Sequence, residues 1–552
     1  MRNFFGIFLL MFIFCSQLSA QKQLTLEDFF VDGTFRTKGV YGLRSMNDGE
    51  HYTVLENNGT RIVKYSYKTG LPVATLLDLK TQEDSPVSRI DDYTFNADES
   101  RILICTNKKP IYRRSFTADY YLFDFKNKEI KPLSEGGSQR LATFSPTGLQ
   151  VAFVRDNNLF IHDIRFGSER QITRDGQYNH IINGAPDWVY EEEFAFNRAF
   201  EWAPDGSAIA YIKFDESDVR EFQMNMFEGQ SPALKQNELY PSNYVYKYPK
   251  AGEKNSKVSV YVYDVSDRTT TKMDTGEEDD IYLPRIRWTQ DPKKLAIIRL
   301  NRHQNKMEVL LANAKVGTIV PLYREENKYY IDESNLDNLV FLDNGTQFVI
   351  TSEKSGYMHL YLYDLNGRER QAITKGNFDI IDFYGYDPVR KLFYYSSYEE
   401  SPLEKYIYSI NEKGLKKKLT PVKGWNEASF SKNFNYYINV VSNTDTPPVT
   451  ALYNAKGKQV RVLEDNKAVK AYNLAKPEFL QIPAADGKTM LNAWIMKPVN
   501  QEAGKKYPLL ITQYSGPNSQ QVKNNWSLSW LNYLAQEGYI VACIDPRGTA
   551  AR

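Results

Sequence analysis

Three successive carboxylates stand inside an aromatic stretch of the chain, in the run DWVYEEEF at residues 187–194. Burying negative charge is costly unless a cation neutralises it. The run therefore predicts an internal cation or a cationic ligand beside Glu191, Glu192 and Glu193. Acidic residues also suit the first turn of a helix, so the charge pattern alone leaves open the plainer interpretation of a solvated helix start.

The rest of the chain offers few of the usual catalytic groups. No Gly-x-Ser-x-Gly sequence, the strand-to-helix turn that carries the serine of α/β hydrolases, occurs in the 552 residues. Ser515 lies in a turn before a proline rather than on such an elbow, and we reject it as a nucleophile. None of the five histidines is a credible base, since all lie in the repeat region: His51, His162, His180, His303 and His359.

Metal, cofactor and nucleic-acid sites are not indicated. No metal-ligand spacing or glycine-rich phosphate loop stands out, so we expect no metal and no cofactor. A formal net charge of +1 provides no basic field for nucleic acid. Cys105 and Cys543 are far apart in sequence, and we expect no disulfide between them.

A recurring turn organises the middle of the chain. Each unit has an aromatic or apolar residue, a short turn rich in Asp, Asn, Pro or Gly, and then an alternating strand, as at residues 144–148 and 202–206. Eight units occupy residues 41–475, mostly about 45 to 60 residues apart, the spacing of four-stranded propeller blades. The 39 Tyr and 30 Phe also favour strands. We expect an eight-bladed β-propeller rather than a sandwich array, whose edges would be hard to protect.

Two regions depart from this repeat. The fourth unit is longer than the others, and the stretch between Asp215 and Gly252 predicts an inserted arm. After residue 476, buried strands at 508–514 and 539–545 flank a helical pattern at 526–537, which is the opening of an α/β sheet. The expected fold is therefore mainly β, an eight-bladed propeller followed by the start of an α/β-hydrolase domain.

The first 20 residues have the features of an export signal. Arg2 gives the positive end, residues 4–14 are almost wholly apolar, and small Ala20 precedes the expected cleavage point. The apolar run is too short to predict a transmembrane span, so we expect no stable membrane anchor. The mature protein is expected to be exported, to the periplasm or as a secreted protein.

Five segments together resemble the dipeptidyl peptidase IV branch of the prolyl oligopeptidase family of serine peptidases, over essentially the whole mature chain. Residues 187–193 resemble the double-glutamate signature of that branch, and residues 112–117 the segment that supplies a substrate-binding arginine. Residues 248–252 are similar to the segment near the dimerisation arm. Residues 514–517 resemble the loop of the oxyanion tyrosine, and residues 545–549 a turn of the hydrolase domain.

The resemblance implies a division of roles. Glu192 and Glu193 would hold the free α-ammonium of a peptide, with Glu191 structural. Arg113 would steady the acidic pair and contact a peptide carbonyl, and Tyr514 would donate its hydroxyl to the tetrahedral oxyanion. An N-terminus anchored at a fixed distance from the nucleophile selects the second peptide bond, so dipeptides would be released, with Pro or Ala preferred in the second position.

The resemblance also implies a domain plan and an incomplete site. The expected units are a signal peptide (1–20), a segment that packs towards the hydrolase domain and includes a short helix (21–40), the propeller (41–475) and a partial hydrolase domain (476–552). The family's serine, aspartate and histidine would follow Asp545, so we expect the 552 residues to lack the triad and, as they stand, peptidase activity. We also expect residues 476–552 to pack poorly.

Two points remain open from the sequence. The arm in the fourth blade and the resemblance together suggest a homodimer. The alternative function is a non-catalytic propeller that binds peptide N-termini or a protein partner.

Overall fold

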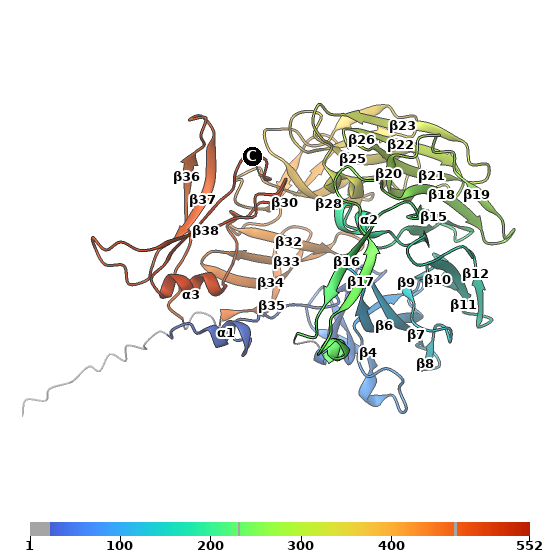
Figure 1. Ribbon diagram of the computed structural model, residues 1–552, viewed down its shortest axis with the longest axis horizontal. Coiled ribbons are helices and arrows are strands. Elements are labelled where there is room, and N and C mark those ends of the chain that lie inside the picture. The colour runs from blue at the N-terminus through green and yellow to red at the C-terminus, as the bar shows by residue number, and fades with distance from the viewer. Residues whose placement is uncertain (1–21, 230–231, 468–471, 552) are drawn as a thin grey trace, which may run out of the picture.

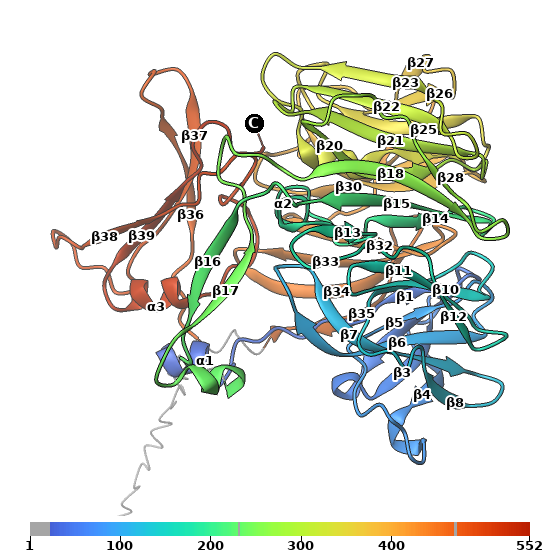
Figure 2. The same ribbon diagram turned by 45° about the vertical axis from the view of Figure 1, so that its right-hand side comes forward.

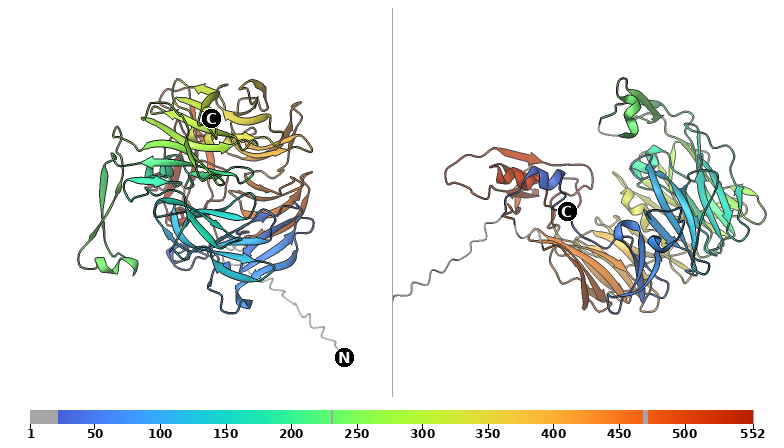
Figure 3. Two further views of the ribbon diagram at one scale, coloured as in Figure 1. Left: turned by 90° about the vertical axis from the view of Figure 1, so that its right-hand side faces the viewer. Right: turned by 90° about the horizontal axis from the view of Figure 1, so that it is seen from below.

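The computed structural model describes residues 22–229, 232–467 and 472–551. In these ranges the chain is mainly β, and eight sheets succeed one another along it, seven with four strands and the fourth with five. Figure 3 shows these sheets arranged around a common centre. Neighbouring strands within each of the eight sheets are antiparallel.

The first four sheets contain β1 (Arg44–Ser45), β2 (His51–Glu56), β3 (Arg61–Ser66) and β4 (Pro72–Asp78); β5 (Asp92–Phe95), β6 (Arg101–Pro110), β7 (Phe116–Asp124) and β8 (Glu129–Pro132); β9 (Arg140–Phe144), β10 (Gln150–Arg155), β11 (Asn158–Asp163) and β12 (Ser168–Gln171); and β13 (Ile181–Asn183), β14 (Phe200–Trp202), β15 (Ala208–Asp215), β18 (Lys257–Asp264) and β19 (Thr270–Lys272).

The next four contain β20 (Ile281–Trp288), β21 (Lys294–Asn301), β22 (Lys306–Asn313) and β23 (Ile319–Glu326); β24 (Val340–Phe341), β25 (Gln347–Ser352), β26 (His359–Asp364) and β27 (Glu369–Ala372); β28 (Ile380–Asp387), β29 (Leu392–Ser397), β30 (Tyr406–Asn411) and β31 (Lys416–Lys418); and β32 (Trp425–Phe430), β33 (Tyr436–Asn443), β34 (Thr446–Asn454) and β35 (Gln459–Asp465). Short 3₁₀ turns are η1 (Asn57–Gly59), η2 (Leu79–Thr81), η3 (Pro232–Asn237) and η4 (Glu333–Asn338).

The recurring turn found in the sequence joins two strands in each of these sheets. In the first, third and fourth sheets the glycine of the turn donates its N–H to the carbonyl three residues earlier, at 3.0, 2.9 and 2.8 Å. Those glycines, Gly49, Gly148 and Gly206, have φ of 64°, 70° and 75°, a region that favours glycine. The turn residues therefore fix the position at which the strand after the turn begins. This part of the sequence prediction is confirmed.

The first and eighth sheets meet. The N–H of Lys432 donates to Ser45 Oγ at 3.0 Å, and the side-chain amide of Asn435 donates to Glu50 Oε1 at 3.3 Å. Residues almost 390 positions apart are thereby held together. The succession of sheets closes on itself, which leaves no sheet at the end of the series without a neighbour.

A second turn, between the third and fourth strands, packs against the preceding sheet. Gly367 in the sixth sheet has φ +76°, and a Cβ there would lie 2.3 Å from the carbonyl oxygen of Leu322 in β23. Gly414 occupies the same turn of the seventh sheet with φ +78°, but a Cβ would meet nothing within 4 Å. The two glycines thus share their backbone conformation and differ only in their surroundings.

We expect Gly367→Ala to lower the free energy of unfolding by about 2 to 4 kcal/mol, because backbone strain and a clash with a carbonyl add together. Gly414→Ala should cost only the strain, about 1 kcal/mol. Urea unfolding followed by tryptophan fluorescence compares the two variants directly. Equal losses would contradict the packing argument.

An arm leaves the fourth sheet, as the sequence predicts. It is a two-stranded hairpin of β16 (Glu221–Met226) and β17 (Ser242–Lys247), inserted between β15 and β18 (Figure 2). Figure 3 shows it projecting from the ring of sheets. Apolar side chains at and near its tip are exposed, including Phe227 (62%), Leu239 (85%) and Tyr240 (82%).

The C-terminal part forms a separate sheet in the order β36 (Glu478–Pro483), β37 (Met490–Met496), β39 (Ile540–Ile544), β38 (Leu509–Thr512), in which β38 and β39 are parallel. Helix α3 (Trp530–Gln536) packs on it around buried Ala535 and Val541. β38 lies at the edge with Leu509 and Ile511 more than half exposed. Poor packing of this region remains a prediction.

The helix expected over residues 526–537 is shorter in the structure, so its predicted start is wrong. Ser529 caps α3, and its hydroxyl accepts from the N–H of Leu531. The preceding segment is bound to the seventh and eighth sheets instead: Asn524 N–H donates to Leu403 O at 2.8 Å, and Trp526 N–H to Ser442 Oγ at 3.2 Å. These contacts hold residues 524–526 along the two sheets, and the capping box of Ser529 and Asn532 starts the helix after them.

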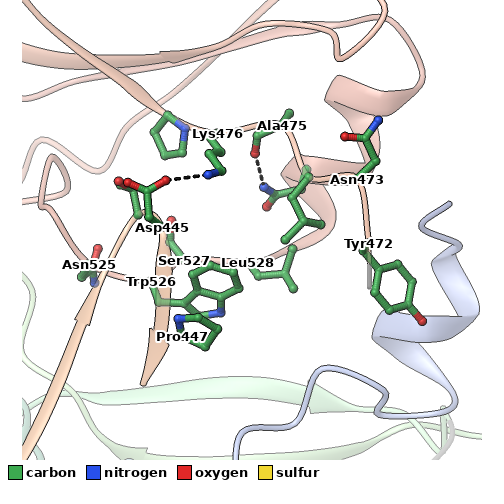
Figure 4. Close-up of a pocket in the computed structure, with 14 residues that line it drawn as sticks. Asp445, Pro447, Tyr472, Asn473, Ala475, Lys476, Asn525, Trp526, Ser527 and Leu528 are labelled. Carbon is green, nitrogen blue, oxygen red and sulfur yellow. Dashed lines mark hydrogen bonds and ion pairs between the residues drawn. The ribbon is translucent and has the colours of Figure 1, made fainter. Parts of the chain in front are cut away.

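A cavity of about 300 Å³ lies where the eighth sheet meets the C-terminal sheet (Figure 4). Lys476 Nζ pairs with Asp445 Oδ1 at 2.6 Å beside the indole of Trp526, and Asn532 donates to the carbonyl of Ala475 at 2.9 Å. The linker between the two parts is therefore fixed by contacts from both.

The N-terminal segment reaches the same region. Helix α1 (Leu26–Phe30) matches the helical pattern expected before the sheets, and Leu24 exchanges two hydrogen bonds with the side chain of Gln536 on α3, at 2.7 and 3.0 Å. Cys105 and Cys543 are buried free thiols. No helix in the described part of the chain is long and apolar enough to cross a membrane. The predicted export signal at residues 1–20 lies outside the described residues.

Candidate functional site

The acidic run forms a single short helix, α2 (Trp188–Glu193), between β13 and β14. Asp187 caps it: one carboxylate oxygen accepts from the N–H of Tyr190 at 2.9 Å and the other from the hydroxyl of Ser256 at 2.5 Å. Burial raises the pKa of Asp187. The Tyr190 hydroxyl in turn accepts from the N–H of Leu283 at 3.0 Å, so the helix is tied to the fifth sheet.

The three glutamates of α2 have different surroundings. Glu191 is 1% exposed, and its Oε1 accepts from the N–H groups of Arg114 at 2.6 Å and Ser115 at 2.7 Å. Glu192 is partly exposed and paired with Arg113, whereas Glu193 is exposed. No basic side chain in the described ranges lies within 4.0 Å of the Glu193 carboxylate. The plainer interpretation of a solvated helix start is therefore wrong, because Glu191 is buried.

Arg113 holds Glu192 in a two-pronged ion pair. Its Nε donates to Glu192 Oε2 at 2.8 Å and its Nη2 contacts Oε1 at 2.8 Å, which is the geometry in which guanidinium and carboxylate match best. Arg113 lies on a tight connection between β6 and β7, closed by a hydrogen bond from Ile111 N–H to Ser115 O at 2.8 Å. Because the arginine side chain is 68% exposed, the pair orients the carboxylate more than it stabilises the fold.

Another cation, the guanidinium of Arg140, interacts with the charge of Glu191. Burial lowers the pKa of Arg140, and the charge of Glu191 opposes that shift. Neither Arg140 Nε nor Glu191 Oε2 has a hydrogen-bond partner. The charge of Glu191 is thus the main compensation for burying Arg140, whereas Glu191 also accepts two backbone hydrogen bonds. The sequence analysis did not identify Arg140.

A cavity of about 1090 Å³ separates α2 from the C-terminal sheet. Glu193, Phe194 and Tyr282 line one side, together with the loop that contains Tyr329, Tyr330 and Glu333. Ser515, Pro517, Asn518 and residues 545–551 line the other side. The side-chain amide of Asn518 donates to Asp332 Oδ2 at 2.5 Å, so the two walls touch at one point.

Tyr514 stands at the rim of this arrangement. It lies two residues after the end of β38 and is 73% exposed, and the next residue, Ser515, lines the cavity with φ +63°. The structure therefore brings the predicted acidic residue Glu193 and the loop of Tyr514 to opposite walls of one cavity. Glu192 and Arg113 lie beside it, next to Glu193.

Sequence reasoning missed the loop at residues 327–333. Its paired tyrosines are exposed (69% and 72%), and burial together with the charges of Asp332 and Glu193 raises the pKa of Glu333. The only signal in the sequence was two adjacent tyrosines between two repeat units. Nothing in that pattern shows that the loop faces α2.

Glu216 lies behind α2, at the base of the arm. It is 6% exposed, and burial, with the charge of Asp187, raises its pKa to about 8, while Lys247 opposes the shift. Asp215 adds to it. Lys247 is itself buried, with Nζ donating to the carbonyl of Val219 at 2.9 Å.

This shift predicts a pH-dependent stability. Between the ordinary carboxyl value of 4.5 and about 8 the folded state binds the Glu216 proton more tightly than the unfolded state, so the free energy of unfolding falls as pH rises through this window. Glu216→Gln should remove that loss and stabilise the protein by about 1 to 3 kcal/mol at pH 8.5, with little effect below pH 4.5. Urea unfolding at several pH values measures the difference, and a gain independent of pH would contradict this assignment.

No group of three or more His, Cys, Asp or Glu side chains that could hold a metal occurs among the described residues. The arrangement is instead a carboxylate pair, steadied by an arginine, on the wall of a cavity. Such a pair can bind one cation while the cavity accommodates the rest of the ligand.

A ring of mostly four-stranded antiparallel sheets that carries this helix defines a known class. Residues 96–448 match the family model "Dipeptidyl peptidase IV (DPP IV) N-terminal region". The chain therefore belongs to the dipeptidyl peptidase IV family.

Particular relatives agree with this assignment. The chain is 30% identical over 484 residues to dipeptidyl peptidase 4 of Trichophyton rubrum, covering 83% of this chain and 61% of the relative. It is 28% identical over 565 residues to a probable dipeptidyl peptidase 4 of Aspergillus fumigatus, covering 96% of this chain and 71% of the relative. The chain thus spans about three fifths of the length of the fungal enzyme from T. rubrum.

Two solved structures are also similar to this chain. The crystal structure of Porphyromonas gingivalis dipeptidyl peptidase 4 superposes with a TM-score of 0.91 at 42% identity, over 96% of this chain and 75% of that one. A putative dipeptidyl aminopeptidase IV from Bacteroides ovatus gives 0.79 at 24% identity and shares the fold.

Proposed function

We propose that this protein releases dipeptides from the free N-termini of peptides, as a serine-type dipeptidyl peptidase. One observation carries the proposal: the Arg113–Glu192 ion pair and the unpaired Glu193 lie together beside a large cavity whose opposite wall is the loop of Tyr514. The names of the relatives support the same activity.

In this proposal Glu192 and Glu193 hold the α-ammonium of the peptide. Arg113 keeps Glu192 oriented and, with its exposed guanidinium, donates to a backbone carbonyl of the bound peptide. Tyr514 donates its hydroxyl to the oxyanion that forms at the scissile carbonyl, a single donation that is worth about 10²–10³ in rate. Fixing the N-terminus fixes which peptide bond reaches the nucleophile, so the product is a dipeptide. Pro or Ala is the expected second residue.

The domain plan follows from the same proposal. The eight sheets would be the blades of a propeller over residues 41–475, and residues 476–552 the first part of an α/β-hydrolase domain, against which residues 21–40 pack. The 552 residues hold no Gly-x-Ser-x-Gly sequence. We propose that the serine, aspartate and histidine belong to a part of the enzyme outside these residues, and that residues 1–552 alone do not hydrolyse peptides.

Location and assembly are further parts of the proposal. The apolar start of the chain is proposed to be a signal peptide over residues 1–20, with export to the periplasm or beyond. The arm is proposed to bind a second copy of the chain, because Phe227, Leu239 and Tyr240 expose apolar surface that a partner would cover.

The test is dipeptide release from a Gly-Pro chromogenic substrate. Residues 1–552 are compared with a form that carries a complete hydrolase domain, and each is also given N-acetyl-Gly-Pro substrate. Release only by the complete form, and only from the free N-terminus, is the expected result. Activity of residues 1–552 would disprove the proposal that the triad lies outside them. Equal activity on the acetylated substrate would disprove the proposal that Glu192 and Glu193 hold the ammonium group. No activity in either form would favour a peptide-binding propeller.

A further inference from the structure

A second cavity, of about 420 Å³, lies on the other side of the segment that leaves α2. Its lining comes from β9, the linker between α2 and β14, and β20, and it includes Asp337 of η4. Phe194 lines the first cavity, and residues 195–198 line the second.

Charged side chains along one wall of this cavity alternate in sign. Arg285, whose side chain is 4% exposed, forms a two-pronged pair with Asp337 at 2.6 and 2.8 Å and also donates to the carbonyl of Phe194 at 2.7 Å. Arg287 contacts the same Asp337 at 3.2 Å and pairs with Glu201. The two carboxylates of the lining are thus already used by two arginines.

A third arginine, Arg198, completes the series without a carboxylate of its own. Within the described chain no Asp or Glu oxygen lies within 4.0 Å of its guanidinium, and Arg198 Nη1 donates a long hydrogen bond to Thr143 Oγ1 at 3.4 Å. Nearby Glu201 attracts it and Arg287 repels it, and the protein around the cavity lowers its pKa. Its side chain is accessible from the cavity.

The residues that line this cavity carry three guanidinium groups and two carboxylates, which gives a net charge of +1. Arg198 is exposed, so its guanidinium can be reached by an anion from solution. A single unmatched guanidinium suits a monoanion with two oxygens, because the planar fork binds a carboxylate through two parallel hydrogen bonds. A dianion such as phosphate would find only one unused cation here.

We propose that Arg198 binds the carboxylate of a peptide in this second cavity, because the charges of Arg285, Asp337, Arg287 and Glu201 already balance and the charge of Arg198 alone is unmatched among the lining residues. The assignment of the carboxylate to a peptide rests on the proposed function, whereas the site itself does not use Glu192 or Glu193. The linker at residues 195–198 directly follows the helix that carries Glu192 and Glu193. The second site is therefore next to the first along the chain.

The test uses probes that lack an ammonium group, so that its outcome is independent of the proposed anchor. Binding of N-acetyl-Gly-Pro to the 552-residue chain is measured by isothermal titration calorimetry and compared with its C-terminal amide, with acetate and with inorganic phosphate. The acid is expected to bind at least tenfold more tightly than the amide. Tighter binding of acetate or phosphate would overturn the assignment to a peptide carboxylate.

Three variants locate the site. Arg198→Gln is expected to lose at least tenfold in affinity for N-acetyl-Gly-Pro, and Arg198→Lys to keep part of it. Arg368→Gln removes an exposed arginine outside the cavity and should bind as the parent does. Circular dichroism and thermal unfolding establish that each variant is folded, and the lysine variant serves if the glutamine variant is not. Unchanged binding in a folded Arg198 variant, or equal binding of acid and amide, would overturn the proposal.

Discussion

Replacing both Glu192 and Glu193 by glutamine is expected to weaken binding of peptides with a free N-terminus by about 10²–10⁴-fold. A hydrogen bond to a charged group contributes about 1.5 to 3 kcal/mol, and two such bonds to the ammonium would be lost together. Glutamine keeps the shape of each side chain, so the loss measures charge rather than packing. The measurement is calorimetric titration of the 552-residue chain with the tripeptide Gly-Pro-Ala.

The controls separate the ammonium from the rest of the peptide. N-acetyl-Gly-Pro-Ala should bind weakly and equally to parent and variant. Glu277 and Glu278 form another adjacent pair of exposed glutamates, outside the lining of the cavity, and their glutamine variants should leave affinity unchanged. The anchor would be disproved if the free and acetylated peptides lost affinity to the same extent.

The single variants should differ, because the two carboxylates start from different states. Glu192 already shares its charge with Arg113 at 2.8 Å, whereas no ion pair of the described chain involves Glu193. An ammonium therefore gains more from Glu193, and Glu193→Gln should account for the larger part of the loss. The expected difference between the two single variants depends on the ion pair of Arg113 and Glu192, which the amino-acid sequence alone does not show.

Local sequence was sufficient for much of the architecture. The turn residues recur once in each sheet, and their effect is local, since Gly148 and its hydrogen-bonded carbonyl are only three positions apart. The acidic helix was also visible as three adjacent glutamates. What separated the roles of those glutamates was the segment around Arg113, which is 79 residues away from Glu192 and meets it because connections of the second and fourth sheets come together.

Longer-range contacts explain the failures. The helical pattern at residues 526–529 was overridden by hydrogen bonds to sheets about 80 to 120 residues away, as with Trp526 and Ser442. Arg140 is one of 69 basic residues, and nothing in its immediate sequence shows that it lies near Glu191 of α2. Period and composition report local structure, while the electrostatics of a site depend on which distant strands meet.

Glu191→Ala is expected to lower the free energy of unfolding by about 3 to 6 kcal/mol, although Glu191 would not touch the peptide. The N–H groups of Arg114 and Ser115 would lose their acceptor while they remain buried or partly buried, at about 1 to 3 kcal/mol each. Arg140 would lose the opposite charge that offsets its burial, which adds to the loss. Urea unfolding followed by tryptophan fluorescence measures the change.

Glu191→Gln is the matched control. Its amide oxygen can still accept from both N–H groups, but it no longer offsets the charge of Arg140, so its loss should be clearly smaller than that of the alanine variant. Peptide affinity should fall in the alanine variant as well, because the connection that carries Arg113 is held to α2 through Glu191. Equal stability of the alanine variant and the parent would show that these buried hydrogen bonds do not hold the connection. Reduced stability with full affinity would show that the position of Arg113 is fixed by other contacts.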